Sequence, residues 1–291
     1  MAGTETSNNQ EYKETVRREW TAAASGWRKW FEIHEAKTAA RAVTSVLLER
    51  ARLQPGDVVL DVGAGYGEPG LSAAAKVGDA GHVTCLDISG DMLAFAEERA
   101  RTAGLSNVAF IEADIETAEL EPDSYDVVLS RAAVMYASDP CETLRHLRRL
   151  LRPGGRLAVA VWATPDKVAF ATPVPVMVEM LGIEPPAGGP GPFALGEHGA
   201  LENLVREAGF TDIAAGATLA VYEFPDSETC TQWVRDVAPP ITELIAGQPA
   251  AVQDEVWNRV TRAWEPFHGE DGHVRLPCTA VWASGSNPSR L

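Results

Sequence analysis

The sequence has little positive charge, few cysteines and no long apolar run. Its 291 residues contain 25 Lys and Arg against 41 Asp and Glu, which gives a formal net charge of −16. Because an acidic surface repels nucleic acids and anionic membranes, we expect neither as a partner. A membrane-spanning helix needs about 18 or more consecutive apolar residues, and no such run occurs, so membrane insertion is not expected either.

The cysteines and the first twenty residues indicate a cytoplasmic protein. The four cysteines stand too far apart in the sequence for a zinc knuckle or a redox pair, so we expect reduced thiols. They are Cys85, Cys141, Cys230 and Cys278. The N-terminal stretch lacks a basic segment followed by an apolar core, which argues against a signal peptide.

The length and a hydrophobic fraction of 45% suffice for one large domain with an elaborated cap. We expect three parts: an N-terminal tail and helical lid over 1–54, a core over 55–163, and cap elements with closing strands over 164–291. In the first part we expect a disordered tail over 1–10. Two helices follow in this prediction, over 11–31 and about 34–53, because apolar residues recur there at helical spacing.

Strand and helix patterns alternate through the core. Five strands are predicted, over 57–62, 82–87, 107–114, 125–131 and 156–162. Ser89 is a plausible N-cap for the helix after the second strand and Gly104 its stop; Asp139, followed by Pro140, has the composition of another helix start. Five successive β-α units argue for an α/β fold with a doubly wound sheet and helices on both faces.

After Trp162 the regular alternation of strand and helix patterns ends. We expect a Pro/Gly linker over 183–192, a helix that stops at Gly209, an extended segment over 211–224, a helical stretch over about 226–268 and a closing strand over 273–284. The segments 163–200 and 226–268 are candidate cap elements. The alternative interpretation is that they only cover the sheet.

The stretch LDVGAGYGEPG, residues 60–70, is a glycine-rich turn between two acids, Asp61 and Glu68. It fits the dinucleotide pattern G-x-G-x-x-G from Gly65, and also the pattern acid-x-G-x-G-x-G from Asp61. A pyrophosphate here would face two carboxylates, and at about 4 Å each like-charge pair costs on the order of 4 kcal/mol at an effective dielectric of about 20. Electrostatics therefore favours the second pattern and a cationic ligand.

Four further segments agree with that reading, each at the end of a predicted strand. Asp87 follows Gly67 by twenty residues, EAD ends at Asp114, YDVVLSR ends at Arg131, and LLRPGGRLAV leads into the fifth strand. In these motifs the sequence resembles the class I S-adenosylmethionine-dependent methyltransferases, strongly over about 55–163. Within that class it is most similar to the group that acts on ubiquinone and menaquinone precursors and on small natural products. The resemblance implies a Rossmann-like, mostly parallel seven-stranded sheet.

The resemblance also implies S-adenosyl-L-methionine as cofactor and a set of residues that bind it. Asp87 would hold both ribose hydroxyls, Asp114 would accept from the adenine amino group, and the N–H of Ile115 would meet the adenine ring. The full set is Asp61, Gly63, Ala64, Gly65, Gly67, Asp87, Ile88, Met92, Asp114, Ile115, Ser130, Arg131, Trp20 and Trp27.

Several of these residues have a second interpretation. Asp87 taken alone also fits a helix N-cap, and Asp114 a solvated turn acid. Glu68 also fits a role in stabilising the N-terminus of its helix. Arg131 faces either the substrate or cofactor, or a neighbouring acid. Trp20, Trp27 and Trp30 are candidates to shield the sulfonium, which an aromatic face attracts. The alternative is core packing, since the spacing of Trp20 and Trp27 also suits one stripe of a packed helix.

We predict methyl transfer without a metal to a small, apolar or aromatic acceptor such as a phenol, a quinol or a natural-product-like molecule, at O, C or N. The alternatives are a non-catalytic cofactor-binding regulatory module and a nicotinamide-dependent dehydrogenase. No catalytic base is identified. Candidates are His34, Tyr136, His198, His268 and His273, with a surface role open for each histidine. Many relatives have two histidines where Met135 and Tyr136 stand here.

One basic segment has no role in this prediction. Arg145, Arg148, Arg149 and Arg152 recur along the helix predicted after Pro140. At helical spacing such a set is expected to form a solvated face.

Overall fold

The structure is a computed structural model that describes residues 2–31, 33, 39–182 and 189–289. Its strands are β1 (Val58–Val62), β2 (His82–Asp87), β3 (Val108–Glu112), β4 (Tyr125–Arg131), β5 (Leu151–Trp162), β6 (Thr211–Phe224) and β7 (Val274–Ser286). Its α-helices are α1 (Ala2–Lys29), α2 (Ala39–Arg50), α3 (Gly70–Val77), α4 (Gly90–Thr102), α5 (Pro140–Leu150), α6 (Pro173–Leu181), α7 (Ala200–Glu207), α8 (Ser227–Val237), α9 (Pro239–Ala246) and α10 (Ala250–Ala263).

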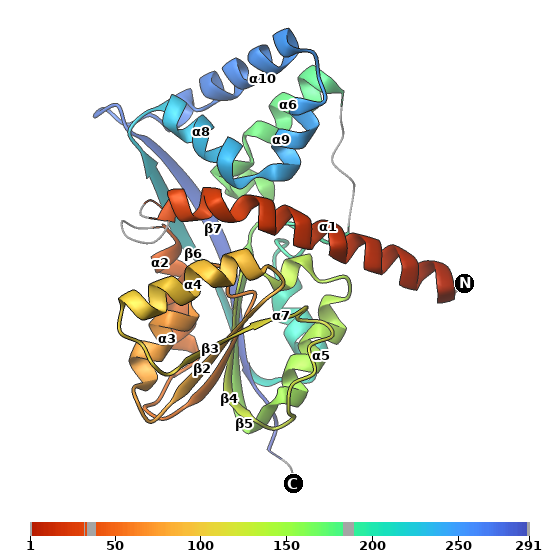
Figure 1. The fold of residues 1–291 in the computed structure, drawn as a ribbon, viewed down its shortest axis with the longest axis vertical. Helices are drawn as coiled ribbons and strands as arrows, with labels where there is room; N and C mark the ends of the chain where they lie inside the picture. The colour runs from red at the N-terminus through yellow and green to blue at the C-terminus, as the bar shows by residue number, and fades with distance from the viewer. Residues whose placement is uncertain (1, 32, 34–38, 183–188, 290–291) are drawn as a thin grey trace.

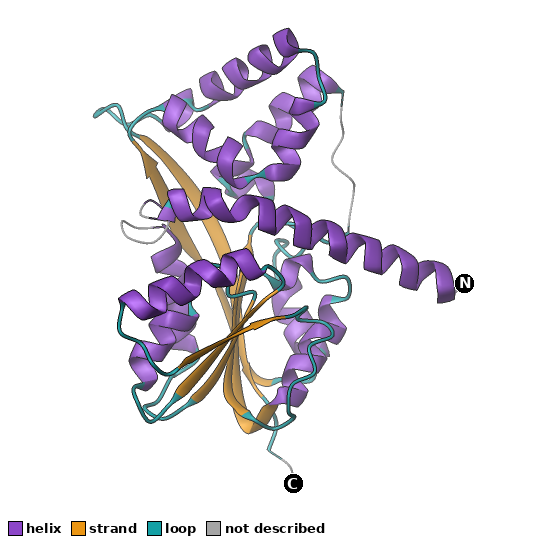
Figure 2. Ribbon diagram, in the orientation of Figure 1, coloured by secondary structure: helices purple, strands orange, loops and turns teal. Residues whose placement is uncertain are grey.

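The seven strands form one sheet in the order β3-β2-β1-β4-β5-β7-β6 (Figure 2). β1 to β5 are parallel, and β7 runs antiparallel to both β5 and β6. One apolar core lies between the sheet and α2, α3 and α4, and a second lies between the opposite face and α5 and α7. The predicted fold class, a doubly wound and mostly parallel seven-stranded sheet, is therefore confirmed.

Local side-chain signals start two of the helices. The Ser89 hydroxyl accepts a hydrogen bond from the Met92 N–H at the start of α4, and the Asp139 carboxylate accepts one from the Glu142 N–H at the start of α5. Each bond satisfies one of the backbone donors that a helix N-terminus leaves unpaired. Both N-cap predictions are confirmed.

The cap consists of α6, α8, α9 and α10 around the part of β6 and β7 that extends beyond the core sheet (Figure 1). Trp264 is fully buried among these elements, and its indole N–H donates to the Thr231 hydroxyl at 3.0 Å. Helix α1 passes between this cap and the core: it contacts α4 on the core side and α8 and α9 on the cap side.

Some predicted elements were wrong in extent. The tail expected to be disordered over 1–10 is helical from Ala2, because no proline interrupts the helix before α1 ends. The helical stretch over 226–268 is three α-helices, since Pro239 begins a new helix and Pro249 precedes another. Helix α6 was not predicted, because its two prolines resemble a loop although both stand in its first turn.

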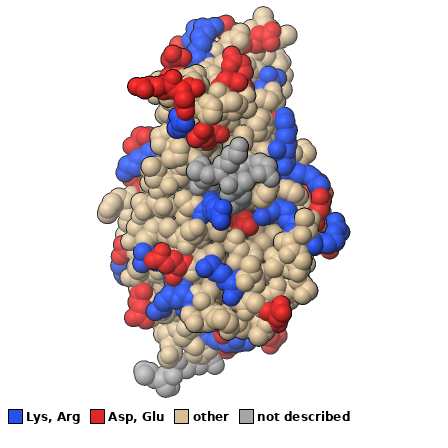
Figure 3. All heavy atoms as spheres, turned by 90° about the vertical axis from the view of Figure 1, so that its left-hand side faces the viewer, with Lys and Arg blue, Asp and Glu red and all other residues tan. Residues whose placement is uncertain are grey.

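The acidic excess is not gathered on the face drawn in Figure 3. There, Lys and Arg side chains are interspersed with Asp and Glu. No helix in the described part of the chain is both long and apolar enough to cross a lipid bilayer.

Candidate functional site

The carboxyl ends of four parallel strands meet at one edge of the sheet, beneath α1 (Figure 1). β1 leads into the glycine turn 63–67, β2 ends at Asp87, β3 is followed by Asp114, and β4 ends at Ser130 and Arg131. Because parallel strands share this edge, motifs far apart in the sequence come together here.

The glycine turn brings bare backbone to this edge. The backbone φ angles of Gly63 and Gly65 are +66° and +52°, values that residues with a Cβ rarely adopt. A Cβ on Gly63 would also lie 2.1 Å from the Cβ of Ala133. The turn is held against β2, because the N–H groups of Gly63 and Ala64 both donate to the Leu86 carbonyl. The turn needs glycine here because of these backbone angles and because Ala133 packs directly against Gly63.

Asp87 accepts two backbone hydrogen bonds at the tip of β2. Its Oδ2 accepts from the Gly65 N–H at 2.8 Å and its Oδ1 from the Ser89 N–H at 2.9 Å. Burial raises the pKa of this carboxyl group, although the backbone donors oppose the shift. Since the N-cap of α4 is Ser89, the alternative role of Asp87 as that N-cap is wrong.

Asp61 and Glu68 flank the turn, and both are buried. Asp61 Oδ2 accepts from the Gly70 N–H at 2.7 Å, and burial raises the pKa of Asp61 to about 7. Glu68 Oε1 pairs with Arg99 at 3.0 Å. Asp61 Oδ1, Glu68 Oε2 and the Ser130 hydroxyl oxygen are buried without a hydrogen-bond partner among the described residues.

Arg131 is held at the end of β4 by two other elements. Its guanidinium donates to the Thr44 hydroxyl on α2 and to the Tyr66 hydroxyl in the glycine turn, both at 2.7 Å. Its positive charge also lowers the pKa of Asp61, against the larger effect of burial. Neither Thr44 nor Tyr66 was among the predicted site residues.

Asp114 is paired with the lid helix. Its Oδ1 accepts from the Glu116 N–H at 3.0 Å and lies 3.4 Å from the Lys13 ammonium of α1, which also pairs with the Glu116 carboxylate. Burial lowers the pKa of Lys13, while Asp114 opposes the shift. Nothing in the sequence linked Lys13 to Asp114, because the two are 101 residues apart and meet only through the placement of α1.

Two of the predicted tryptophans lie at this edge and the third does not. Trp27 stacks on Tyr66 of the glycine turn at 5.8 Å, and Trp20 meets the edge of Tyr136 at 5.6 Å, both measured between ring centroids. The Trp30 indole N–H instead donates to Asp236 on α8 at 2.7 Å. The lid helix therefore covers the glycine turn with aromatic rings.

Ile88, Met92 and Ile115 complete the predicted set. Met92 is buried beside the turn, where its Cε lies 3.3 Å from where a Cβ on Gly65 would stand. Ile88 and Ile115 are half-buried, directly after Asp87 and Asp114. All the predicted cofactor-binding residues thus belong to the carboxyl edge of the sheet or to the lid helix above it.

The histidine candidates do not converge on this edge. His198 is exposed in the loop before α7. His268 bonds to Ser227 of the cap at 2.7 Å, and His273 bonds to Glu223 at 2.8 Å. His34 lies outside the described residues. Tyr136 alone is near the site, and burial raises the pKa of its hydroxyl well above the usual range, so it stays protonated as a hydrogen-bond donor.

The polar groups at this edge suit a ligand that brings positive charge and hydrogen-bond donors. Asp61, Glu68 and Ser130 each present a buried carboxylate or hydroxyl oxygen without a hydrogen-bond partner among the described residues. A phosphate would add negative charge beside Asp61 and Glu68, whereas a sulfonium or ammonium group lowers the cost of burying them. Within the described ranges, no three His, Cys, Asp or Glu side chains come together as a metal site.

The raised pKa of Asp61 has a measurable consequence in the ligand-free protein. The pKa moves from 3.8 to about 7 on folding, so the Asp61 contribution to stability is complete below about pH 4 and is lost as the pH rises through 7. The amide introduced by Asp61→Asn does not titrate. We expect the unfolding free energy of Asp61→Asn, relative to wild type, to rise by on the order of 2 kcal/mol between about pH 5 and pH 8 in urea titrations.

Asp91→Asn is the matched control for this titration, because Asp91 is exposed in the first turn of α4. Its difference from wild type should change little over the same pH range. A difference between Asp61→Asn and wild type that is flat or falls with pH would contradict a raised Asp61 pKa.

Comparison with known proteins agrees with this geometry. Residues 53–173 match the family described as methyltransferase domain. The chain is 35% identical over 149 residues to methyltransferase GfsG of Streptomyces halstedii, covering 50% of this chain and 53% of that protein. It is 34% identical over 113 residues to the ubiquinone/menaquinone biosynthesis C-methyltransferase UbiE of Vibrio campbellii, covering 38% and 44%. The chain thus spans about half the length of these curated relatives.

The fold also matches a solved structure. Phosphoethanolamine N-methyltransferase 2 of Haemonchus contortus, in complex with S-adenosyl-L-methionine, aligns with a TM-score of 0.60 at 17% identity over 96% of this chain and 60% of that one. This likeness concerns the fold, whereas the sequence matches carry the family. Residues 53–173, whose motifs line the carboxyl ends of the parallel strands, thus form a methyltransferase domain.

Proposed function

We propose that this protein transfers a methyl group from S-adenosylmethionine to a small apolar or aromatic acceptor held between the carboxyl edge of the sheet and the cap. The observation that carries the proposal is the set of buried, unpartnered oxygens of Asp61, Glu68 and Ser130 beside a bare glycine turn. The cofactor, when bound, supplies an electrophilic methyl group on a positively charged sulfur.

In this proposal the chain's own residues bind and orient the cofactor. Asp87 accepts from the ribose hydroxyls, Asp114 from the adenine amino group, and the turn from Gly63 to Gly67 carries backbone close to the methionine part. The carboxylates of Asp61 and Glu68 provide negative charge near the cationic end. Proximity and alignment of this kind can supply up to roughly 7–11 kcal/mol of the barrier reduction in well-oriented systems.

Lys13 has to share Asp114 with the adenine amino group. In the structure the Lys13 ammonium lies against Asp114 and Glu116, and both carboxylates are half-buried. An adenine amino group that bonds Asp114 would leave Glu116 as the remaining partner of Lys13. The lid helix would then stay attached at this point while the cofactor is held.

An aromatic cluster behind the site supports an apolar or aromatic acceptor. We define it as Trp162, Phe170, Phe193, Tyr222 and Trp233. Trp162 ends β5, beside the end of β4, and its ring centroid lies 5.2 Å from that of Phe170, which lies 6.0 Å from that of Phe193. These three rings are half-buried, so part of their surface remains for a ligand.

The pKa of the acceptor group determines whether methyl transfer gains from a general base. A neutral amine needs no base, whereas a phenol or an activated ring carbon gains from one. Tyr136, a protonated donor, supports orientation of the acceptor by a hydrogen bond. Of the histidine candidates, His198 is exposed, His268 bonds to Ser227 and His273 bonds to Glu223, while His34 lies outside the described residues. We therefore propose an acceptor that is oriented by hydrogen bonding and loses its proton to solvent or to a group of its own.

Turnover is expected to be independent of a metal ion. A Mg²⁺ site would need two or three oxygen ligands beside the methyl group, and Arg131 places a positive charge at the end of β4 where such an ion would sit. Release of S-adenosylhomocysteine should be measured across phenols, quinols, amines and indoles, with product mass analysis. For any acceptor found, EDTA should leave the rate unchanged; a loss that Mg²⁺ restores would contradict the proposal.

A non-catalytic cofactor-binding module is the alternative, and the same assay separates the two. It would bind S-adenosylmethionine and release S-adenosylhomocysteine slowly with every acceptor tested. We also propose that the protein acts in the cytoplasm, which the four unpaired cysteines support.

A further inference from the structure

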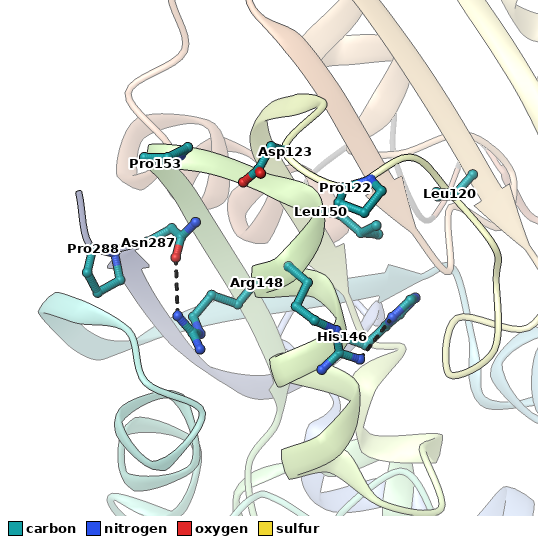
Figure 4. A pocket seen from close by; sticks show the side chains of 10 residues that line it. Leu120, Pro122, Asp123, His146, Arg148, Leu150, Pro153, Asn287 and Pro288 are labelled. Carbon is teal, nitrogen blue, oxygen red and sulfur yellow. Dashed lines mark hydrogen bonds between the residues drawn. The ribbon is translucent and has the colours of Figure 1, made fainter. Parts of the chain in front are cut away.

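A hollow lies at the opposite end of the strands from the proposed cofactor site. It has a volume of about 380 Å³ and is formed by the end of α5, the loop before β4, the start of β5 and the segment after β7 (Figure 4). These are the amino ends of β4 and β5, so nothing in this hollow belongs to the methyl-transfer site.

Two arginines of α5, Arg148 and Arg149, line this hollow, whereas Arg145 of α5 and Arg152 of β5 do not. Arg145 pairs with Glu142, and Arg152 pairs with Asp126 at 2.6 Å. Arg148 and Arg149 line the hollow, and neither forms a salt bridge with any carboxylate in the described part of the chain. The expectation of a solvated face is confirmed for Arg149, which is exposed, whereas Arg148 is half-buried and Arg152 lies in β5 and not on the helix.

The Arg148 side chain is held by its neighbours, but not all of its guanidinium donors have a hydrogen-bond partner. Its Nε is buried without a hydrogen-bond partner among the described residues, and its Nη1 reaches Asn287 Oδ1 only at 3.4 Å. The guanidinium packs over Gly209, since a Cβ there would lie 3.3 Å from the Arg148 Cζ. The Nε is therefore closed off from the hollow, and an oxyanion in the hollow would bind the outer Nη groups of the guanidinium.

Arg149 is oriented by a neutral histidine. Its guanidinium lies 3.4 Å from His146 Nδ1, while His146 Nε2 bonds to the Ala118 carbonyl at 3.1 Å. Burial and the charge of Arg149 both lower the pKa of His146, so the ring accepts from Arg149 and donates to Ala118. Among the described residues, the charged groups that line the hollow are Arg148, Arg149 and the acid Asp123.

We propose that this hollow binds the phosphate group of a small organic molecule, with Arg148 and Arg149 as its ligands. The remaining wall includes Leu120, Pro122, Pro153 and Pro288, which provide apolar surface for the organic part. The two arginines also stand in the last turn of α5, where they complement the helix dipole. That structural role requires no ligand, and binding measurements distinguish it from the proposal.

Calorimetric titration with phenyl phosphate and with inorganic phosphate tests this site on the full chain. Phenyl phosphate should bind saturably and more tightly than inorganic phosphate. Arg148→Gln and Arg149→Gln should each weaken it by at least about tenfold, the scale for losing one charge-assisted hydrogen bond. Arg145→Gln, on the same helix but paired with Glu142, should bind as wild type does.

Melting curves of the ligand-free variants show whether each remains folded. The proposal is overturned if neither phosphate binds saturably, or if folded Arg148→Gln and Arg149→Gln bind phenyl phosphate as tightly as wild type. Equal affinity for the two phosphates would overturn the assignment of the apolar wall to an organic group.

Discussion

Asp87→Ala is expected to weaken the binding of S-adenosylmethionine and S-adenosylhomocysteine by roughly 10- to 1,000-fold while the protein stays folded. In the proposed complex this carboxylate accepts from two ribose hydroxyls, and each charge-assisted hydrogen bond contributes about 1.5–3 kcal/mol. The loss should exceed that of a single contact, because Asp87 also accepts from the Gly65 and Ser89 N–H groups and so fixes the turn against the start of α4.

Isothermal calorimetry with S-adenosylhomocysteine measures this effect without any acceptor. Asp91→Ala is the matched control, since Asp91 is an exposed carboxylate four residues away in the first turn of α4. It should bind as wild type does. Unchanged affinity in a folded Asp87→Ala variant would show that Asp87 only organises the backbone of the turn.

Gly26→Ala is expected to lower turnover roughly 100-fold by displacing the lid helix. Gly26 is buried where α1 crosses the end of α8, and a Cβ there would lie 2.0 Å from the Asp236 carbonyl oxygen. The helices must move apart to admit a methyl group, and α1 also carries Trp20 and Trp27. Misplacement of a positioning element by about 1 Å can cost about 100-fold in rate.

The same substitution should leave the helix itself intact, because Ala is about 1 kcal/mol more favourable than Gly inside a helix. Without its packing against α8, however, the helix opens more often, so tryptic cleavage within α1, at Arg17 or Arg28, should become faster while the rest of the chain keeps its protection. Ser25→Ala, an exposed neighbouring position, is the control and should change neither rate. Wild-type turnover and protection in Gly26→Ala would show that close packing of α1 on α8 has no part in catalysis.

The sequence predicted the core because its signals there are local. Ser89 and Asp139 predict helix starts, because each stands three residues before the N–H group that it caps. Each acid of the cofactor motifs stands at or next to the end of a strand. Parallel topology then brings those ends together whatever lies between them. The resemblance to S-adenosylmethionine-dependent methyltransferases then implied a role for the candidate site residues from Asp61 to Arg131.

The lid and cap contacts could not be predicted in this way. Lys13 reaches Asp114, and Gly26 touches Asp236, only because α1 lies across two other elements, and helical periodicity does not show which partner a helix face meets. The positions of the histidine candidates could not be predicted for a related reason. Their residue type suits a general base, but His268 and His273 bond to cap residues instead of facing the cofactor edge.

The central claim is that the glycine turn and its carboxylates hold S-adenosylmethionine and not a nicotinamide dinucleotide. Titrating the wild-type protein with S-adenosylhomocysteine and with NAD in the same calorimeter tests it directly. We predict saturable, one-to-one binding of S-adenosylhomocysteine, and no measurable binding of NAD, because its pyrophosphate would meet the carboxylates of Asp61 and Glu68. Tight binding of NAD with none of S-adenosylhomocysteine would contradict the account.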